Sequence, residues 1–344
     1  TKKSLLQPKP PACPCTSPEH VIFSTSVRGG SWRLALVPTF AAFFVGGLTA
    51  IQSRANGSLA DVLGSGLQAA TLSFATGLLI TTFIVVTSKR LRLGVRTLMA
   101  SVRKADLRIW ELFGGFIGAF FVLSQSVSVP VIGVSLFSVA VVSGQSSSAL
   151  IVDRLGLGPH GRQPMTRWRV LSALIGLSAV FVAVSGGVDQ SQRPSTWLVI
   201  MCFVAGVGIS IQQAINGRVS KASGEPLVAA WFNFITGTSI LLVALLLMSM
   251  VGVIDIAALP SGPAWLYVGG FVGVIFIATT AWVVGKIGVL RLSLLAIAGQ
   301  LVGSLLLDLF VKGELEGSLI AGVLLAFAAV SVNAIRRPIN RAMD

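Results

Sequence analysis

Residues 44–80 read FVGGLTAIQSRANGSLADVLGSGLQAATLSFATGLLI, and residues 204–240 read VAGVGISIQQAINGRVSKASGEPLVAAWFNFITGTSI. Aligned without gaps, the two segments are identical at 13 of 37 positions, including an I-Q-x-x-x-N-G motif at 51–57 and 211–217. Repeats of this length reveal the organisation of a chain before any single residue does. We therefore interpret the chain as two copies of one unit.

The repeat continues beyond this first block. Residues 110–153 match residues 265–308 at 15 of 44 positions, from a W-x-x-x-G-G-x-x-G motif to a G-Q pair followed by Asp153 or Asp308. The offset between the copies falls from 160 to 155, so the second copy has a loop that is five residues shorter. Both copies are predicted to contain the same set of helices.

The composition indicates whether the chain folds in water or in lipid. Hydrophobic residues make up 54% of the chain, charged residues only 11%, and the mean hydropathy is +0.86. Soluble domains carry roughly a quarter of charged residues. The formal net charge is +14, but the basic residues lie between apolar segments rather than in one continuous patch, which argues against nucleic-acid binding. The chain is predicted to be a polytopic membrane protein whose surroundings are the lipid bilayer.

Apolar segments long enough to span a bilayer divide the chain. Backbone polar groups in lipid must be satisfied internally, so we predict an all-α integral membrane protein. The domains are a disordered cytoplasmic leader at 1–30, a first five-helix repeat at 31–186, and a second at 187–344 with a short basic tail. Cys13 and Cys15 in the leader have no accompanying His or Cys cluster, so no metal site and no cofactor are predicted. The ten predicted spans are 34–52, 67–87, 110–129, 131–151, 170–186, 197–215, 227–250, 265–284, 289–309 and 318–335, with breaks near Pro130 and at 285–288.

The distribution of charge orients the spans. With a cytoplasmic N-terminus, 23 of the 26 Lys and Arg residues fall on the cytoplasmic side, which is the arrangement that the positive-inside rule favours. Five helices per copy is an odd number, so the copies enter the membrane in opposite directions and both chain ends are cytoplasmic. Inverted repeats of this kind support alternating access, with a small-molecule substrate near the bilayer midplane.

This architecture favours a secondary transporter. The alternative is a non-transporting membrane scaffold or assembly protein. An enzyme is disfavoured, because His20 and His160 lie outside the predicted spans and the sequence has no H-E-x-x-H motif. No G-x-x-x-x-G-K-[ST] phosphate loop is present that would indicate an ATP-driven pump.

The set of repeated motifs resembles the YdcZ-type inner-membrane exporters of the drug/metabolite transporter superfamily, in their fused two-repeat form. The resemblance covers residues 34–335, and the second copy departs from the first at Val207, Gly208 and Asn233. It implies a ten-helix exporter fold in the bacterial inner membrane. The resemblance implies no particular substrate. We expect a small metabolite or an amphiphilic or cationic compound. The chain could also form a homodimer.

The paired amides are the first candidate substrate-binding residues. Gln52 and Asn56 share one helix face, as do Gln212 and Asn216, because residues four apart are neighbours on a helix. For the asparagines we favour a helix-capping role, because each precedes a glycine at a predicted helix end. For the glutamines we favour substrate contact. The predicted topology puts the first pair near the outer face and the second near the inner face, as two matched gates.

Four further polar or aromatic residues are candidates. Gln145 and Gln300 each follow a glycine inside a predicted span, where they could either hold helices together or face a cavity. Asn233 lies in an aromatic cluster that begins with Trp231. Aromatic faces hold cationic or planar ligands, while contact with lipid is the simpler alternative.

Three carboxylates complete the set. Asp153 and Asp308 end predicted helices, where a negative charge opposes the helix dipole and needs compensation. We favour structural ion pairs, with proton coupling as the alternative. Glu111 is expected at a cytoplasmic helix end, exposed to solvent.

Overall fold

The structure is a computed structural model, and it describes residues 31–159, 161–162, 165–185, 196–259, 262–312 and 317–335. Within these ranges every regular element is helical, which confirms the all-α part of the prediction. The leader with Cys13 and Cys15 and the basic tail lie outside the described residues. The α-helices are α1 Ser31–Leu63, α2 Gly66–Thr87, α3 Lys89–Arg103, α4 Gly114–Leu155, α5 Arg167–Ser185, α6 Thr196–Ser223, α7 Pro226–Met250, α8 Val268–Ile287, α9 Val289–Lys312 and α10 Gly317–Ile335. Two short 3₁₀ helices, η1 Ile109–Phe113 and η3 Ala264–Tyr267, precede α4 and α8.

Seven helical stretches of the described chain are long and apolar enough to cross a membrane, judged by length and composition. One of them, Ile109–Leu155, runs through η1 and the whole of α4 and therefore includes two of the predicted spans. Helices α5 and α10 contain shorter apolar stretches. The multi-pass character is thus confirmed, whereas the count of ten crossings remains a prediction.

Matched glycines break the helices of both copies in the same way. Gly133 divides α4 with φ 77° and ψ 167°, and Gly288 separates α8 from α9 with φ 82° and ψ 166°. A positive φ is strained for residues with a side chain, so glycine is required at both breaks. The first break therefore lies at Gly133 rather than at Pro130, which stays inside the helix.

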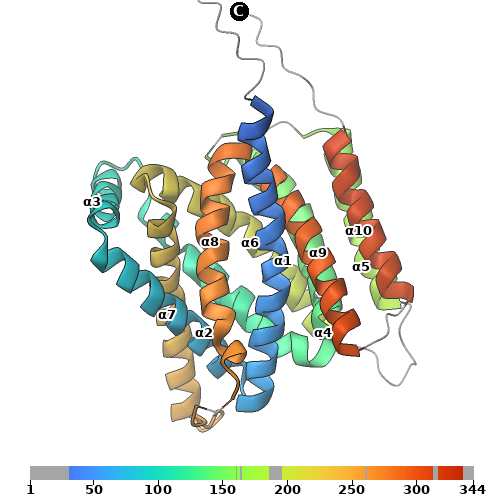
Figure 1. Cartoon of the computed structure of the whole chain (residues 1–344), viewed down its shortest axis with the longest axis horizontal. Helices are drawn as coiled ribbons and strands as arrows, with labels where there is room; N and C mark the ends of the chain where they lie inside the picture. Colours follow the sequence, from blue (N-terminus) through green and yellow to red (C-terminus); the bar gives the residue numbers. More distant parts are fainter. Residues whose placement is uncertain are drawn as a thin grey trace, which may run out of the picture.

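Helices from opposite copies pack together most extensively, α1 against α9 and α6 against α4 (Figure 1). Glycine makes these contacts possible. A Cβ at Gly46 would lie 1.9 Å from the carbonyl oxygen of Ala296, and one at the equivalent Gly206 would lie 2.0 Å from that of Val141. Small residues allow such backbone contact between membrane helices, so the copies interlock rather than lying as separate domains.

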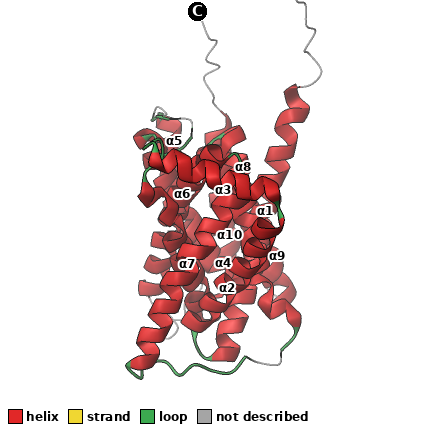
Figure 2. Cartoon of the chain, turned by 90° about the vertical axis from the view of Figure 1, so that its left-hand side faces the viewer, coloured by secondary structure: helices red, strands yellow, loops and turns green. Residues whose placement is uncertain are grey.

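Helix α3 was not predicted, because its basic residues read as a loop. It begins at the N-cap Ser88, whose side chain accepts the backbone N–H of Leu91 at 3.4 Å. Its apolar residues recur at helical spacing, and Leu91 and Leu98 are buried while Arg92 and Arg96 are exposed. An amphipathic helix of this kind lies along a surface, and Figure 2 shows α3 across the upper end of the bundle.

The bundle buries polar side chains within its apolar core, and its exterior is apolar. Serine, threonine and amide side chains are buried between the helices, whereas many large apolar side chains face outward. Large exposed apolar surfaces mark contact with a partner or a membrane. Examples of exposed residues are Phe40, Phe83, Phe181 and Phe310.

Candidate functional site

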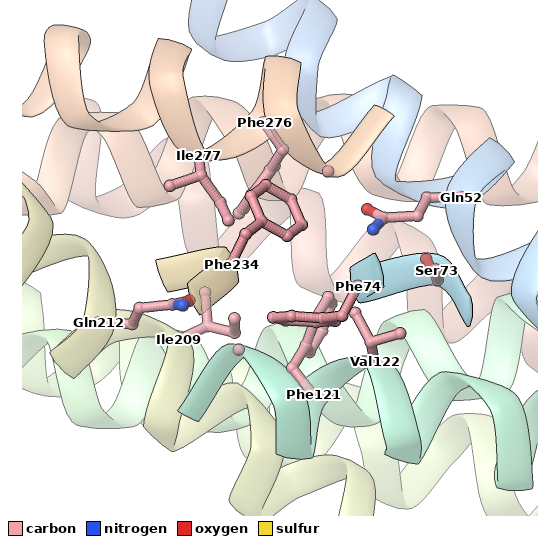
Figure 3. A pocket seen from close by; sticks show the side chains of 12 residues that line it. Gln52, Ser73, Phe74, Phe121, Val122, Ile209, Gln212, Phe234, Phe276 and Ile277 are labelled. Atoms are coloured by element: carbon pink, nitrogen blue, oxygen red, sulfur yellow. The ribbon is translucent and has the colours of Figure 1, made fainter. Parts of the chain in front are cut away.

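A narrow cavity lies at the centre of the bundle, where α1, α2, α4, α6, α7 and α8 meet (Figure 3). The empty space between its lining residues, together with adjoining space that is open to solvent, amounts to about 340 Å³. No ionisable side chain is among its lining residues. The lining consists of Gln52, Ser73, Phe74, Gly118, Phe121, Val122, Ile209, Gln212, Phe234, Gly273, Phe276 and Ile277.

Ten of these twelve residues are repeat-related pairs. The lining is therefore built twice, once from each copy, around one shared space. The pairs are Gln52 with Gln212, Phe74 with Phe234, Gly118 with Gly273, Phe121 with Phe276, and Val122 with Ile277.

Two phenylalanines of the cavity wall meet at the centre of the bundle. The ring centroids of Phe74 and Phe234 are 5.2 Å apart at an interplanar angle of 56°. A Cβ at Gly237 would lie 2.2 Å from the Phe74 ring, and one at Gly77 would lie 2.2 Å from the Phe234 ring. Each ring thus packs against a glycine of the opposite helix, at a position where a side chain would collide with the ring.

The Gly-Gly motifs at the starts of α4 and α8 face the polar motifs of the other copy. A Cβ at Gly115 would lie 2.0 Å from the carbonyl oxygen of Asn233, and one at Gly270 would lie 2.2 Å from that of Ser73. At Gly269 a Cβ would lie 2.1 Å from Oδ1 of Asn56. Gly115 and Gly270 therefore let α4 and α8 approach the backbone of α7 and α2, and Gly269 leaves room for the Asn56 side chain.

The amides of the second copy form a hydrogen-bonded chain. Nε2 of Gln212 donates to Oδ1 of Asn233 at 2.8 Å and to the carbonyl oxygen of Gly114 at 3.1 Å. Nδ2 of Asn233 then donates to Oδ1 of Asn216 at 2.6 Å and to the carbonyl oxygen of Ala229 at 2.8 Å. Buried amides are normally paired in this way, and the chain holds Gln212 at the cavity wall.

The first copy makes different bonds. Nδ2 of Asn56 donates to Oε1 of Gln125 at 2.8 Å, and Nε2 of Gln125 donates to the hydroxyl of Ser53 at 2.9 Å. Oδ1 of Asn56 is buried without a hydrogen-bond partner in the described chain. Gln52 is only 4% exposed, and its side chain points into the cavity (Figure 3).

The capping role expected for the asparagines is wrong. Helix α1 continues past Asn56 to Leu63, and α6 continues past Asn216 to Ser223. The left-handed glycines follow these ends, at Gly64 and Gly224. Asn56 and Asn216 instead lie within their helices, almost fully buried.

The expectation of two gates near opposite membrane faces also fails, because Gln52 and Gln212 line the same cavity. The helices are longer than predicted, so the motif lies in mid-helix rather than at a helix end. The structure therefore brings the two glutamines to one site.

Other candidates lie outside the cavity lining. Gln145 and Gln300 are buried, and Gln145 accepts the Ser210 hydroxyl at its backbone carbonyl at 3.0 Å. The indole N–H of Trp231 donates to the Thr82 hydroxyl at 3.0 Å. Gln145 and Trp231 thus take part in contacts between helices.

Two of the three carboxylates, Glu111 and Asp308, differ from expectation. Glu111 is 1% exposed rather than solvated, and its carboxylate pairs with the Arg218 guanidinium at 2.9 Å and accepts the backbone N–H of Arg108 at 2.9 Å. Oδ2 of Asp308 accepts the backbone N–H of Ser135 at 3.2 Å, just after the break in α4. The carboxylate of Asp308 therefore caps the second arm of α4. Asp153 is buried at the equivalent position of the other copy.

Several site residues were missed by sequence reasoning. Phe74 and Phe234 are identical in both copies, as are Phe121 and Phe276, so the repeat itself carried the signal. Gln125 has threonine at the equivalent position, so no repetition marked it.

Comparison with known proteins agrees with this architecture. The family model described as "Putative inner membrane exporter, YdcZ" matches residues 37–182 and again 197–334. One solved structure, described only as "Crystal structure of protein", is similar at 15% identity and a TM-score of 0.57, covering 87% of this chain and 96% of that one. At this identity the likeness shows the fold alone. No curated protein matches. The chain is therefore a multi-pass inner-membrane protein of the drug/metabolite transporter type, and it belongs to the YdcZ family of inner-membrane exporters.

Proposed function

We propose that the protein is a secondary transporter that exports a small neutral or amphiphilic molecule by alternating access. One observation carries the proposal: a central cavity whose walls are contributed by equivalent residues of two interlocked copies. Copies related by an inverted repeat can pack in two equivalent ways, one open to each side of the membrane. A site on the axis between them is then reached from either side.

In this proposal the chain crosses the membrane ten times, with both ends in the cytoplasm, as two repeats at 31–186 and 187–344. The two arms of α4 count as separate crossings, and the end of the bundle that carries α3 faces the cytoplasm. The basic residues of α3 support this orientation, because lysine and arginine are enriched on that side. Exposed Arg92 and Arg96 suit the headgroup region.

The two ends of the pathway are closed by different contacts. At the end near α3, Glu111 pairs with Arg218, and the Arg90 guanidinium pairs with Glu225. The positions equivalent to Glu111 and Arg218 hold Leu266 and Ser58, so the opposite end has no such ion pair there. Opening the pathway at the end near α3 would break this ion pair, whereas opening it at the other end would not. The two access states therefore differ in free energy.

The lining limits the substrate. Four phenylalanine rings and several aliphatic side chains suit an apolar or aromatic body, while two glutamines and a serine suit a hydrogen-bonding group. A fully charged substrate is disfavoured, because burying an unpaired charge is costly and the lining offers no countercharge. The aromatic faces leave room for a weakly hydrated cation as a second class.

Flux into proteoliposomes tests the transporter proposal. Radiolabelled nicotinamide, a neutral aromatic carboxamide, is the probe, with a panel of neutral aromatic solutes beside it. Val122→Trp fills the cavity and is expected to abolish flux. Val86→Trp, on the exposed face of α2, is the matched control and is expected to transport as the wild type does. Flux of the whole panel no faster than in empty liposomes, or equal flux with the cavity filled, would contradict the proposal and favour a scaffold.

Cysteine accessibility tests the orientation. With Cys13, Cys15 and Cys202 replaced by serine, a cysteine in place of exposed Arg96 is expected to react with an impermeant maleimide only when the cytoplasmic side is accessible. A cysteine in place of Val253, in the loop after α7, is expected to react from the other side. Labelling of both positions from one side would rule out the proposed topology.

A further inference from the structure

The two halves of the cavity are not equivalent in their hydrogen bonding. Gln52 and Gln212 occupy the same position in the repeat and line the same space. Nε2 of Gln212 donates hydrogen bonds to Oδ1 of Asn233 at 2.8 Å and to the carbonyl oxygen of Gly114 at 3.1 Å. Gln52 is equally buried, yet in the described part of the chain its side chain has no hydrogen-bond partner.

One substitution between the copies explains the difference. The position of Asn233 is occupied by Ser73 in the first copy. The serine side chain is too short to bridge, as Asn233 does, from the glutamine to the asparagine one turn further along. Two groups are left over as a result: the Gln52 amide, which faces the cavity, and Oδ1 of Asn56, which is buried without a partner.

Unsatisfied buried polar groups are rare in proteins, because each loses its bonds to water without replacement. The Gln52 amide and the Ser73 hydroxyl line the cavity, so they are a ready site for a ligand that supplies the missing bonds. Gln52 offers both a donor and an acceptor, and the Ser73 hydroxyl offers either. The aromatic rings of Phe74 and Phe234 lie next to these groups (Figure 3).

We propose that substrate is held asymmetrically, through hydrogen bonds to Gln52 and Ser73, and that its class is a neutral molecule with a planar apolar body and a carboxamide-like group. This inference rests on the proposed function and assigns its polar contacts to the first copy. The Gln212, Asn233 and Asn216 chain is then the structural counterpart, which holds the opposite wall in place. The glutamine that the repeat makes identical thus has a different role in each copy.

The variant Ser73→Asn tests this inference without changing Gln52. It gives this position of the first copy the residue of the second, so the introduced amide can accept from Gln52 and donate to Oδ1 of Asn56. We expect Tm to rise by roughly 2 °C, because two buried groups become paired. Asn233→Ser is the reverse change and is expected to lower Tm by at least as much. Equal effects of the two variants on Tm, in the same direction, would contradict the inference.

Binding of nicotinamide to purified protein in detergent, measured by saturation-transfer NMR, is the second readout. Gln52→Ala and Ser73→Asn are each expected to weaken binding roughly tenfold. Gln145→Ala removes an equally buried glutamine outside the cavity and is the matched control. Two related probes test the ligand class: 3-methylpyridine lacks the carboxamide and nicotinate carries a charge, and both are expected to bind more weakly.

The outcomes separate the two proposals. If the wild type transports members of the panel but Gln212→Ala weakens nicotinamide binding as much as Gln52→Ala does, the site is symmetric and this inference is wrong while the proposed function stands. The same holds if the wild type transports but does not bind nicotinamide. If the wild type neither transports nor binds any member of the panel, the proposed function itself fails.

Discussion

Phe74 and Phe234 contact each other at the centre of the bundle, with ring centroids 5.2 Å apart, although 160 positions separate them in the sequence. Each ring lies over the glycine on the other's helix, Gly237 or Gly77. A contact between equivalent residues can occur only on the axis that relates the two copies. The pseudo-two-fold axis therefore passes between these rings, through the wall of the cavity.

Adding a methyl group at either glycine is expected to destabilise the protein by similar amounts. In Gly77→Ala and Gly237→Ala the new Cβ would lie 2.2 Å from a phenylalanine ring, so the ring must shift. Overpacking of this kind costs about 1–3 kcal/mol. Thermal unfolding in detergent measures the loss, and Gly285→Ala is the control, because a Cβ there meets no other atom within 4 Å. A large effect at only one of the two glycines would contradict the symmetric contact.

Removing the Glu111 carboxylate is expected to destabilise the end of the bundle near α3. Arg218 keeps only partial contact with solvent, and the backbone N–H of Arg108 loses its acceptor. We expect Glu111→Leu to cost about 1–3 kcal/mol, less than a fully buried pair because the Arg218 side chain is 33% exposed.

Adding Arg218→Ser to Glu111→Leu reproduces the Leu266 and Ser58 of the other copy. The double variant is expected to be more stable than the Glu111→Leu single variant, because no charge is left unpaired. A double-mutant cycle on the unfolding free energy measures this coupling. Additive losses would show that the ion pair contributes nothing.

The carboxylate of Asp308 is expected to matter as a cap and not as a proton carrier. Asp308→Asn keeps an oxygen that can accept the Ser135 N–H, so we expect near wild-type stability and flux. Asp308→Ala removes the acceptor and is expected to cost about 0.5–2 kcal/mol. Loss of pH-driven flux in a fully folded Asp308→Asn protein would show that the carboxylate couples transport to protons.

Helix α3 is expected to be held to the bundle by its buried apolar side. Leu98 is fully buried, so Leu98→Ala removes a core contact and is expected to cost about 2–4 kcal/mol. Leu93 is 63% exposed on the same helix, and Leu93→Ala is the matched control. Hydrogen exchange of the α3 amides is the measurement, and it is expected to be faster in Leu98→Ala alone. Equal exchange in both variants would mean that α3 is not docked through Leu98.

Sequence reasoning predicted the membrane class, the helical fold and the duplication correctly, because each depends on local composition or on a direct match between segments. It ended α1 and α6 too early, because Asn56 and Asn216 precede glycines and resemble helix caps. Where polar side chains are buried between helices, the same amides bond to neighbouring helices, and the helix continues. In the sequence, an asparagine that caps a helix looks the same as one that is buried, because only the structure shows its hydrogen-bond partner.

The repeat alone determined that the protein is built from two related halves, and composition alone determined that they lie in lipid. Only the tertiary structure decided that Gln52 and Gln212 meet in one cavity, because their separation depends on how α1 and α6 pack against helices of the other copy. It also decided which glutamine is already paired. That outcome depends on side-chain length, because Asn233 reaches Gln212 and the serine at the equivalent position, Ser73, is shorter.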